Sequence, residues 1–224
     1  MFATQAVVEV STIIIFLLSA VLAVYLTRNY LRIKARSLIF WSAGLWLFAL
    51  GVILEILFAF GIYSEFLIAT YLFVVALLVN SLALGSMELL KSRKLKWPYY
   101  IFSIAAETAL LYSLVVSNIG NIISTYVVWG ILPLLVVTMS SIITFVAAII
   151  LVVIAVMTYL RTKNKKMLSI IAGVIIVSVA GSLYIVQFPA FLYYSEFIGI
   201  VLLWFGFFSF KSSKQKASAN KSSR

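Results

Sequence analysis

The distribution of lysine and arginine along the chain constrains its fold more than any other feature. All 17 basic residues fall into four short clusters, separated by long stretches that contain none. The clusters are Arg28, Arg32, Lys34 and Arg36; Lys91, Arg93, Lys94 and Lys96; Arg161, Lys163, Lys165 and Lys166; and Lys211, Lys214, Lys216, Lys221 and Arg224. Membrane proteins retain positive charge on the cytoplasmic side of their spans, so we expect all four clusters there.

The stretches between the clusters are too apolar for a soluble domain. Hydrophobic residues make up 65% of the chain and charged residues 10%, whereas ordinary globular chains carry about 25% charged residues. We therefore predict a multi-pass protein of the plasma membrane whose main partner is the lipid bilayer. The net charge of +11 belongs to the span ends on this interpretation, and no nucleic-acid partner is expected.

The order of the clusters predicts the number of spans. Between two cytoplasmic clusters the chain must cross an even number of times, and even the longest interval, Lys96 to Arg161, is too short for four spans of about 20 residues. One more span precedes Arg28. The fold class predicted is an all-α bundle of seven transmembrane helices over 1–210, with the N-terminus outside and the C-terminus inside. The expected helices are 6–27, 38–60, 65–90, 98–117, 135–160, 167–188 and 194–210.

Two segments are left over from this count. Residues 118–134 are apolar and aromatic, and extending the fifth helix back through them would give about 60 Å, twice the hydrocarbon thickness. Two interpretations of residues 118–134 stay open: an interfacial or re-entrant outer segment, or a long outer loop packed on the helix ends. Residues 211–224 are rich in serine and lysine and predict a disordered basic cytoplasmic tail.

The tetrapeptide YSEF occurs twice, at Tyr63–Phe66 and at Tyr194–Phe197. Each copy follows a basic cluster and a glycine (Gly51 or Gly181) at nearly the same distance. The match predicts a parallel three-helix repeat, with halves at about 6–90 and 135–210 joined by the linker helix 98–117. Parallel repeats related by an axis along the membrane normal are a known plan of transporters.

This 3-1-3 arrangement resembles the SWEET sugar transporters and the microbial rhodopsins, over nearly the whole chain and by topology. The resemblance implies a seven-helix fold. A rhodopsin needs a lysine in its seventh helix to bind retinal, but FLYYSEFIGIVLLWFGFFSF has none, so retinal is not expected. The Pro-Gln pair of the SWEET family is also missing, because the three prolines precede Tyr99, Leu134 and Ala190.

Three polar side chains within the expected spans form a candidate intramembrane site, since an ionisable group near the bilayer centre costs a few kcal/mol. Glu107 lies near the middle of the fourth helix, and Asn80 lies in the third. Glu55 shares a helical face with Gly44 and Gly51, which predicts that it points toward protein. The three residues could bind a proton or a cation, or they could serve as neutral polar contacts between helices.

The two YSEF copies carry a second candidate. Glu65 and Glu196 fall in the first turn of their helices, where a carboxylate is favoured, and Tyr63 and Tyr194 fit an aromatic belt. Two alternatives remain. The repeated tetrapeptide marks the start of a helix in both places, or these four residues form a binding site at the outer mouth. Glu88, by contrast, is explained by a surface ion pair with Lys91 or Arg93.

The missing residue types limit the chemistry. The chain has no cysteine, no histidine and no aspartate, which leaves no thiol nucleophile and none of the usual haem or zinc ligands. No cofactor, no metal site and no enzymatic activity are expected. The sequence favours a small-solute or ion transporter, with proton linkage as an option. The alternative is a non-catalytic accessory subunit of a larger membrane complex, and a homo-oligomer is compatible with either.

Overall fold

The computed structural model describes residues 2–90, 92–120, 123, 124, 127, 128, 132–163, 169, 172, 173, 176 and 194–206. Five long helices dominate them: α1 (Phe2–Ile33), α2 (Arg36–Ala59), α3 (Glu65–Met87), α4 (Arg93–Val116) and α5 (Leu134–Thr162). All five contain a stretch long and apolar enough to cross a membrane. A shorter apolar helix, Tyr194–Gly206, which we call helix 194–206, follows. The helical class and the first five expected spans are confirmed to this extent.

The rest of the predicted topology falls only partly within the described residues. Of the expected helix 167–188, the structure describes Ser169, Ala172, Gly173 and Ile176, all helical. The expected tail 211–224 lies outside. Within 118–134 the described residues form a small antiparallel hairpin, β1 (Ile123–Ser124) paired with β2 (Val127–Val128), an element that the sequence did not predict.

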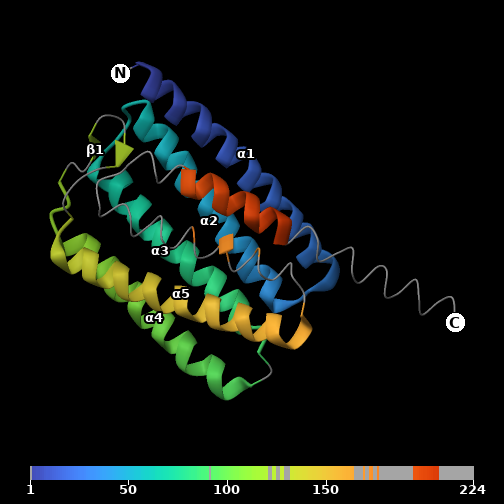
Figure 1. The fold of residues 1–224 in the computed structure, drawn as a ribbon. Helices are drawn as coiled ribbons and strands as arrows, with labels where there is room; N and C mark the ends of the chain where they lie inside the picture. The colour runs from blue at the N-terminus through green and yellow to red at the C-terminus, as the bar shows by residue number, and fades with distance from the viewer. Residues whose placement is uncertain are drawn as a thin grey trace, which may run out of the picture.

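The long helices run side by side in an up-and-down order (Figure 1). α1 packs against α2, and α2 against α3; α5 packs against both α3 and α4. Helix 194–206 returns to the start of the chain, where Nε1 of Trp204 donates a hydrogen bond to the carbonyl oxygen of Leu18, at 3.0 Å. This arrangement places α3 between α2 on one side and α4 and α5 on the other.

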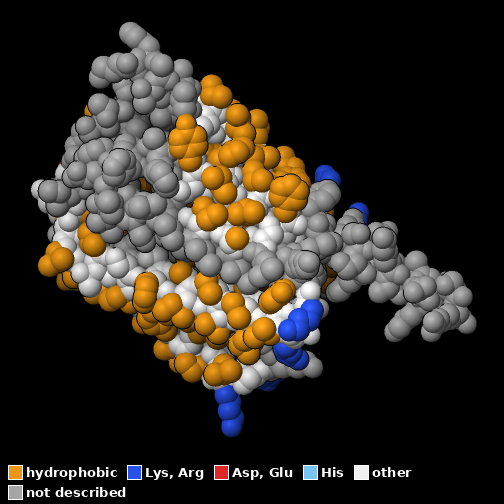
Figure 2. Space-filling view, viewed as in Figure 1, with side chains coloured by type: hydrophobic (Ala, Val, Ile, Leu, Met, Phe, Trp, Pro, Cys, Tyr) orange, Lys and Arg blue, Asp and Glu red, His pale blue; other side chains and the backbone are white. Residues whose placement is uncertain are grey.

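The connections gather the basic residues at one end of the bundle, which we call the basic end. Lys34 follows α1, Arg93 begins α4 and Lys163 follows α5. Figure 2 shows lysine and arginine at this end of the visible face, and hydrophobic side chains over much of the rest of its described part. A bilayer requires apolar surface along the helices and accepts positive charge at their ends.

Two hydrophobic clusters fill the described interior. The one toward the basic end combines α1, α2, α3, α5 and helix 194–206, with Leu22, Phe48, Leu82, Leu151 and Leu203 among its members. The one toward the opposite end combines α2, α3, α4 and α5, with Leu54, Phe58, Ile68, Leu110 and Ile143. Every polar contact described below is therefore set among close-packed apolar side chains or at the edge of them.

α1 and α5 end in the same way. α1 ends with Tyr30-Leu31-Arg32-Ile33-Lys34 and α5 with Tyr159-Leu160-Arg161-Thr162-Lys163. In both, the lysine adopts a left-handed backbone, with φ of 52° and 50°, and its N–H donates to the carbonyl oxygen of the tyrosine at 2.7 Å. A left-handed residue other than glycine is uncommon, so two sequences that differ at one position of five and end in this conformation are a second local match between the chain's two halves.

Candidate functional site

Helix α3 supplies one partner to each of three polar centres of the bundle. Tyr71 lies near its start and Asn80 in its second half, about 13 Å further along at 1.5 Å per residue. Glu88 is the residue directly after its last turn. Two of the centres join α3 to α4 and the third joins it to α2; the three are described from the basic end outward.

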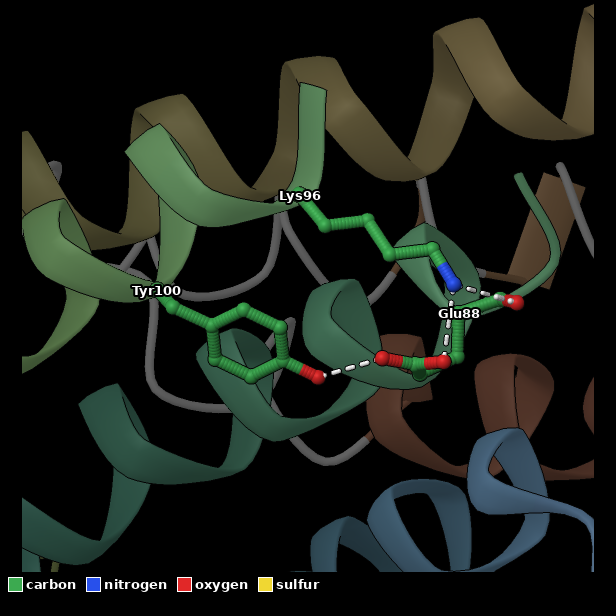
Figure 3. Close-up of polar contacts among 3 residues, drawn as sticks. All are labelled: Glu88, Lys96 and Tyr100. Carbon is green, nitrogen blue, oxygen red and sulfur yellow. Dashed lines mark hydrogen bonds and ion pairs between the residues drawn. The ribbon is translucent and has the colours of Figure 1, made fainter. Parts of the chain in front are cut away.

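At the basic end, the carboxylate of Glu88 is held by two residues of α4. Nζ of Lys96 lies 2.8 Å from Oε2, and Oη of Tyr100 donates to Oε1 at 2.6 Å (Figure 3). Burial alone would raise the pKa of Glu88, but the hydrogen bonds from Lys96 and Tyr100, with the charges of Lys96 and Arg36, outweigh it. The pKa of Glu88 is therefore held below its ordinary value, and an ionic contact joins the end of α3 to the start of α4.

The partner of Glu88 differs from the prediction. The sequence pointed to Lys91 or Arg93, but the ion pair in the described part of the chain is with Lys96; Lys91 lies outside it. The reason is that α4 begins at Arg93, five residues before the predicted start at Pro98. The earlier start turns Lys96 back toward the end of α3.

The second centre is built around Asn80, whose side chain is fully buried (0% exposed). Its Oδ1 accepts hydrogen bonds from Oη of Tyr99 at 2.6 Å and from Oγ of Ser103 at 3.1 Å. Its Nδ2 donates to Oε1 of Glu107 at 2.5 Å. With both hydroxyls donating to Oδ1, the amide directs its N–H at Glu107.

Glu107 lies past the midpoint of α4 and is half-buried. The amide of Asn80 holds one of its oxygens, and the other makes no hydrogen bond to any described residue. The arrangement is a positioned carboxyl at membrane depth with one oxygen available. Such a group can exchange a proton or contact a passing cation or hydroxyl group.

The third centre lies toward the end opposite the basic end, where Oη of Tyr71 donates to Oε1 of Glu55 at 2.7 Å. Both side chains are buried, Glu55 with 3% exposed. The predicted burial of the small-residue face is confirmed, since Gly44 approaches Leu78 and Leu82 of α3 closely. The ring of Tyr71 is fixed by an edge contact with Phe58, 5.7 Å between centroids.

Glu196 of helix 194–206 belongs to this third centre. Only 9% of it is exposed, and its carboxyl interacts electrostatically with that of Glu55. In the described part of the chain, Oε2 of Glu55 and Oε2 of Glu196 are the two buried side-chain atoms without a hydrogen-bond partner. Three elements, α2, α3 and helix 194–206, therefore bring together two carboxyls and one phenol.

The structure regroups the residues that the sequence singled out. Asn80 contacts Glu107, but Glu55 belongs to a different centre, because Tyr71 and Asn80 are nine residues apart and so lie on opposite sides of α3. Helix 194–206 contributes a residue that the sequence had assigned to the outer mouth.

The two YSEF copies also differ in environment. Tyr63 and Tyr194 are both exposed, at 45% and 60%. Glu65 is exposed and Ser64 caps α3 by accepting from the N–H of Leu67, which is the helix start that the sequence predicted. In the second copy the glutamate is buried beside Glu55, so the outer-mouth pair of Glu65 and Glu196 does not share one environment.

Tyr71 and Tyr99 were missed by reasoning from the sequence, although a signal was present. In an antiparallel hairpin, residues equally distant from the turn lie side by side. Tyr71 lies about as far after the α2–α3 turn as Glu55 lies before it, and Tyr99 and Asn80 are related in the same way across the next turn. Aromatic residues of an apolar chain look like belt or core residues until such partners are considered.

The described residues contain no group of three or more acidic side chains that could hold a metal ion. Comparisons of the chain with protein-family models, with curated proteins and with solved structures found no match. The polar centres are therefore the features from which a function can be inferred.

Proposed function

We propose that this protein is a transporter of a small solute or an ion in the plasma membrane, with proton linkage and without catalytic apparatus. The observation that supports this proposal most is the carboxyl of Glu107, which lies at membrane depth. The buried amide of Asn80 sets its position, and one of its oxygens makes no hydrogen bond to described residues. A side chain of this kind is costly in a membrane, and in membrane proteins such groups mark substrate or ion pathways.

The organisation around Glu107 supports a binding role over simple helix adhesion. A single hydrogen bond would suffice to join α3 to α4, yet Tyr99 and Ser103 also engage Asn80 and thereby orient its amide. A donor that is itself held by two further residues fixes the geometry of the Glu107 carboxyl, as a binding site needs.

We further propose seven spans, with the basic end in the cytoplasm, and a parallel repeat of two three-helix units. The two YSEF copies support the repeat, and so do the matching ends of α1 and α5, where Lys34 and Lys163 share the left-handed conformation. The two matches have almost the same offset along the chain. Transporters built from parallel repeats bind their substrate near the interface of the two units.

The test combines purification with solute profiling. A tag on the 211–224 segment allows gentle extraction and mass spectrometry of whatever co-purifies. In parallel, the soluble metabolites of cells that express the wild type, Glu107→Gln or Glu65→Gln are compared by mass spectrometry. We expect a solute class whose cellular content changes with the wild type and with Glu65→Gln but not with Glu107→Gln.

The alternative function, an accessory subunit of a larger membrane complex, predicts a different result. Stoichiometric partners would co-purify, and no solute would distinguish the Glu107→Gln cells from the wild type. That pair of outcomes would refute transport and would let the chemistry of the partners define the role of this chain.

A further inference from the structure

We propose that Glu55 and Glu196 form a proton-binding pair, in which one proton carried on Oε2 of Glu55 is shared with Oε2 of Glu196. The pair joins the end of α2 to helix 194–206 and is separate from the Asn80–Glu107 centre. Its proton would be taken up from, and returned to, the side of the membrane opposite the basic end. The inference does not depend on the transport proposal.

The first support is the state of the carboxyl oxygens. Glu55 and Glu196 are both more than nine-tenths buried, and each leaves Oε2 without a hydrogen-bond partner among the described residues. A buried polar atom without a partner costs about 1–3 kcal/mol, and a charged one costs more. A proton between the two carboxyls gives both oxygens a partner at once.

The second support is that no cation compensates the pair within the described part of the chain. There, the titratable groups recorded against the pair are Tyr71 from α3 and the two carboxyls themselves. The ion pair found in the described residues, Glu88 with Lys96, is at the basic end. Two like charges buried side by side repel each other strongly, so paired carboxyls keep a proton between them.

The third support is the direction of the helices, which makes the charged form less favourable for Glu55 than for Glu196. Glu55 is the fifth residue from the end of α2, on the side of the helix whose partial negative charge disfavours a carboxylate. Glu196 is the third residue of helix 194–206, near the partial positive charge of a helix start. Tyr71 donates to the other oxygen of Glu55 and leaves Oε2 to carry the proton.

Infrared spectroscopy of the purified full chain in lipid nanodiscs tests the proposal, because a protonated carboxyl has its own carbonyl band, which shifts in heavy water. The wild type should show this band, and the band should be lost as pH is raised. Glu55→Gln should remove it and Glu196→Gln should shift it. The matched control, Glu65→Gln, changes the exposed glutamate of the other YSEF copy and should leave it intact.

Three outcomes would overturn the proposal. The wild type could lack a titrating band; the band could survive unchanged in Glu55→Gln; or sodium or potassium could abolish it at fixed pH, which would make the pair a cation site. If Glu55→Gln fails to fold, the wild type and Glu196→Gln still decide, since an unchanged band in Glu196→Gln excludes a shared proton. None of these measurements requires transport, so this proposal and the proposed function fail separately.

Discussion

The indole ring of Trp41 in α2 lies directly on Gly85 in α3. Its Nε1 donates to the carbonyl oxygen of Leu82 at 3.2 Å and to Oγ of Ser86 at 3.3 Å. A Cβ atom at Gly85 would overlap the ring and would lie 3.0 Å from the carbonyl oxygen of Ser37. The lack of a side chain at Gly85 therefore lets the ring of Trp41 pack directly against α3 and hold α2 and α3 together.

Gly85→Ala should destabilise the protein by roughly 1–3 kcal/mol, because the hydrogen-bonded ring cannot withdraw without losing both acceptors. Gly51→Ala is the matched control: its Cβ would meet only Val74, at 3.9 Å, and alanine should gain about 0.5–1 kcal/mol in a helix. Thermal unfolding in detergent, followed by tryptophan fluorescence, should show Tm changes of opposite sign. A loss of Tm in both variants would contradict the assigned contact.

Asn80→Ala should cost about 1–3 kcal/mol, since it removes the common partner of Tyr99, Ser103 and Glu107 from a buried position. Asn118→Ala changes an exposed asparagine whose Oδ1 accepts one hydrogen bond, from the N–H of Gly120, and should cost less, about 0.5–1 kcal/mol. Chemical unfolding of the two variants in the same micelles measures the difference. Equal effects would show that the amide contributes nothing to the interior.

Tyr71→Phe keeps the ring that contacts Phe58 and removes the hydroxyl that donates to Glu55. We expect a loss of about 1–2 kcal/mol, because an acceptor oxygen is left buried without its donor. The exposed Tyr63 provides the control, and Tyr63→Phe should be nearly neutral. The unfolding midpoints of the two variants, measured in the same lipid environment, test whether the hydroxyl of Tyr71 stabilises the fold.

The ion pair of Glu88 predicts a pH dependence. The folded state holds the pKa of Glu88 below its ordinary value, so the unfolded chain binds this proton more readily. The stabilisation is complete above the ordinary glutamate pKa of about 4.3 and disappears as pH falls through the lower folded-state pKa. The side chains of Lys96 and Glu88 are 16% and 8% exposed, so the pair is partly buried and should contribute about 1–2 kcal/mol. Glu88→Gln should flatten the acid side of a Tm-against-pH curve, whereas Glu65→Gln should not.

The left-handed lysines offer a test of the matching helix ends. Lys34→Gly should leave stability unchanged or raise it by up to about 1 kcal/mol, because glycine adopts positive φ without strain. Arg28→Gly removes a charge from the same cluster but from the helix interior, and should cost about 1 kcal/mol. If Lys163→Gly behaves differently from Lys34→Gly, the two helix ends are not equivalent.

Much of the fold was open to prediction because its causes act along the chain. Apolar runs of sufficient length and basic clusters at their ends depend on local composition, and they located five helices to within a few residues except at the two ends of α1 and the start of α4. The cap of Ser64 on α3 was also predictable from its place before Glu65. The start of α4 was predicted at Pro98 but lies at Arg93, and nothing local reveals that Lys96 reaches Glu88.

The partners of the polar groups could be decided only by tertiary structure. Glu55, Asn80 and Glu107 look alike in the sequence, each a polar residue in an apolar helix. The rotation of α3 turns Tyr71 toward Glu55 and Asn80 toward Glu107, and the return of helix 194–206 sets Glu196 beside Glu55. Which side chains meet depends on how distant helices pack, because contacts between them carry no periodic signal in either helix. Composition determined that this chain forms membrane-length helices; packing determined which carboxyls share a site.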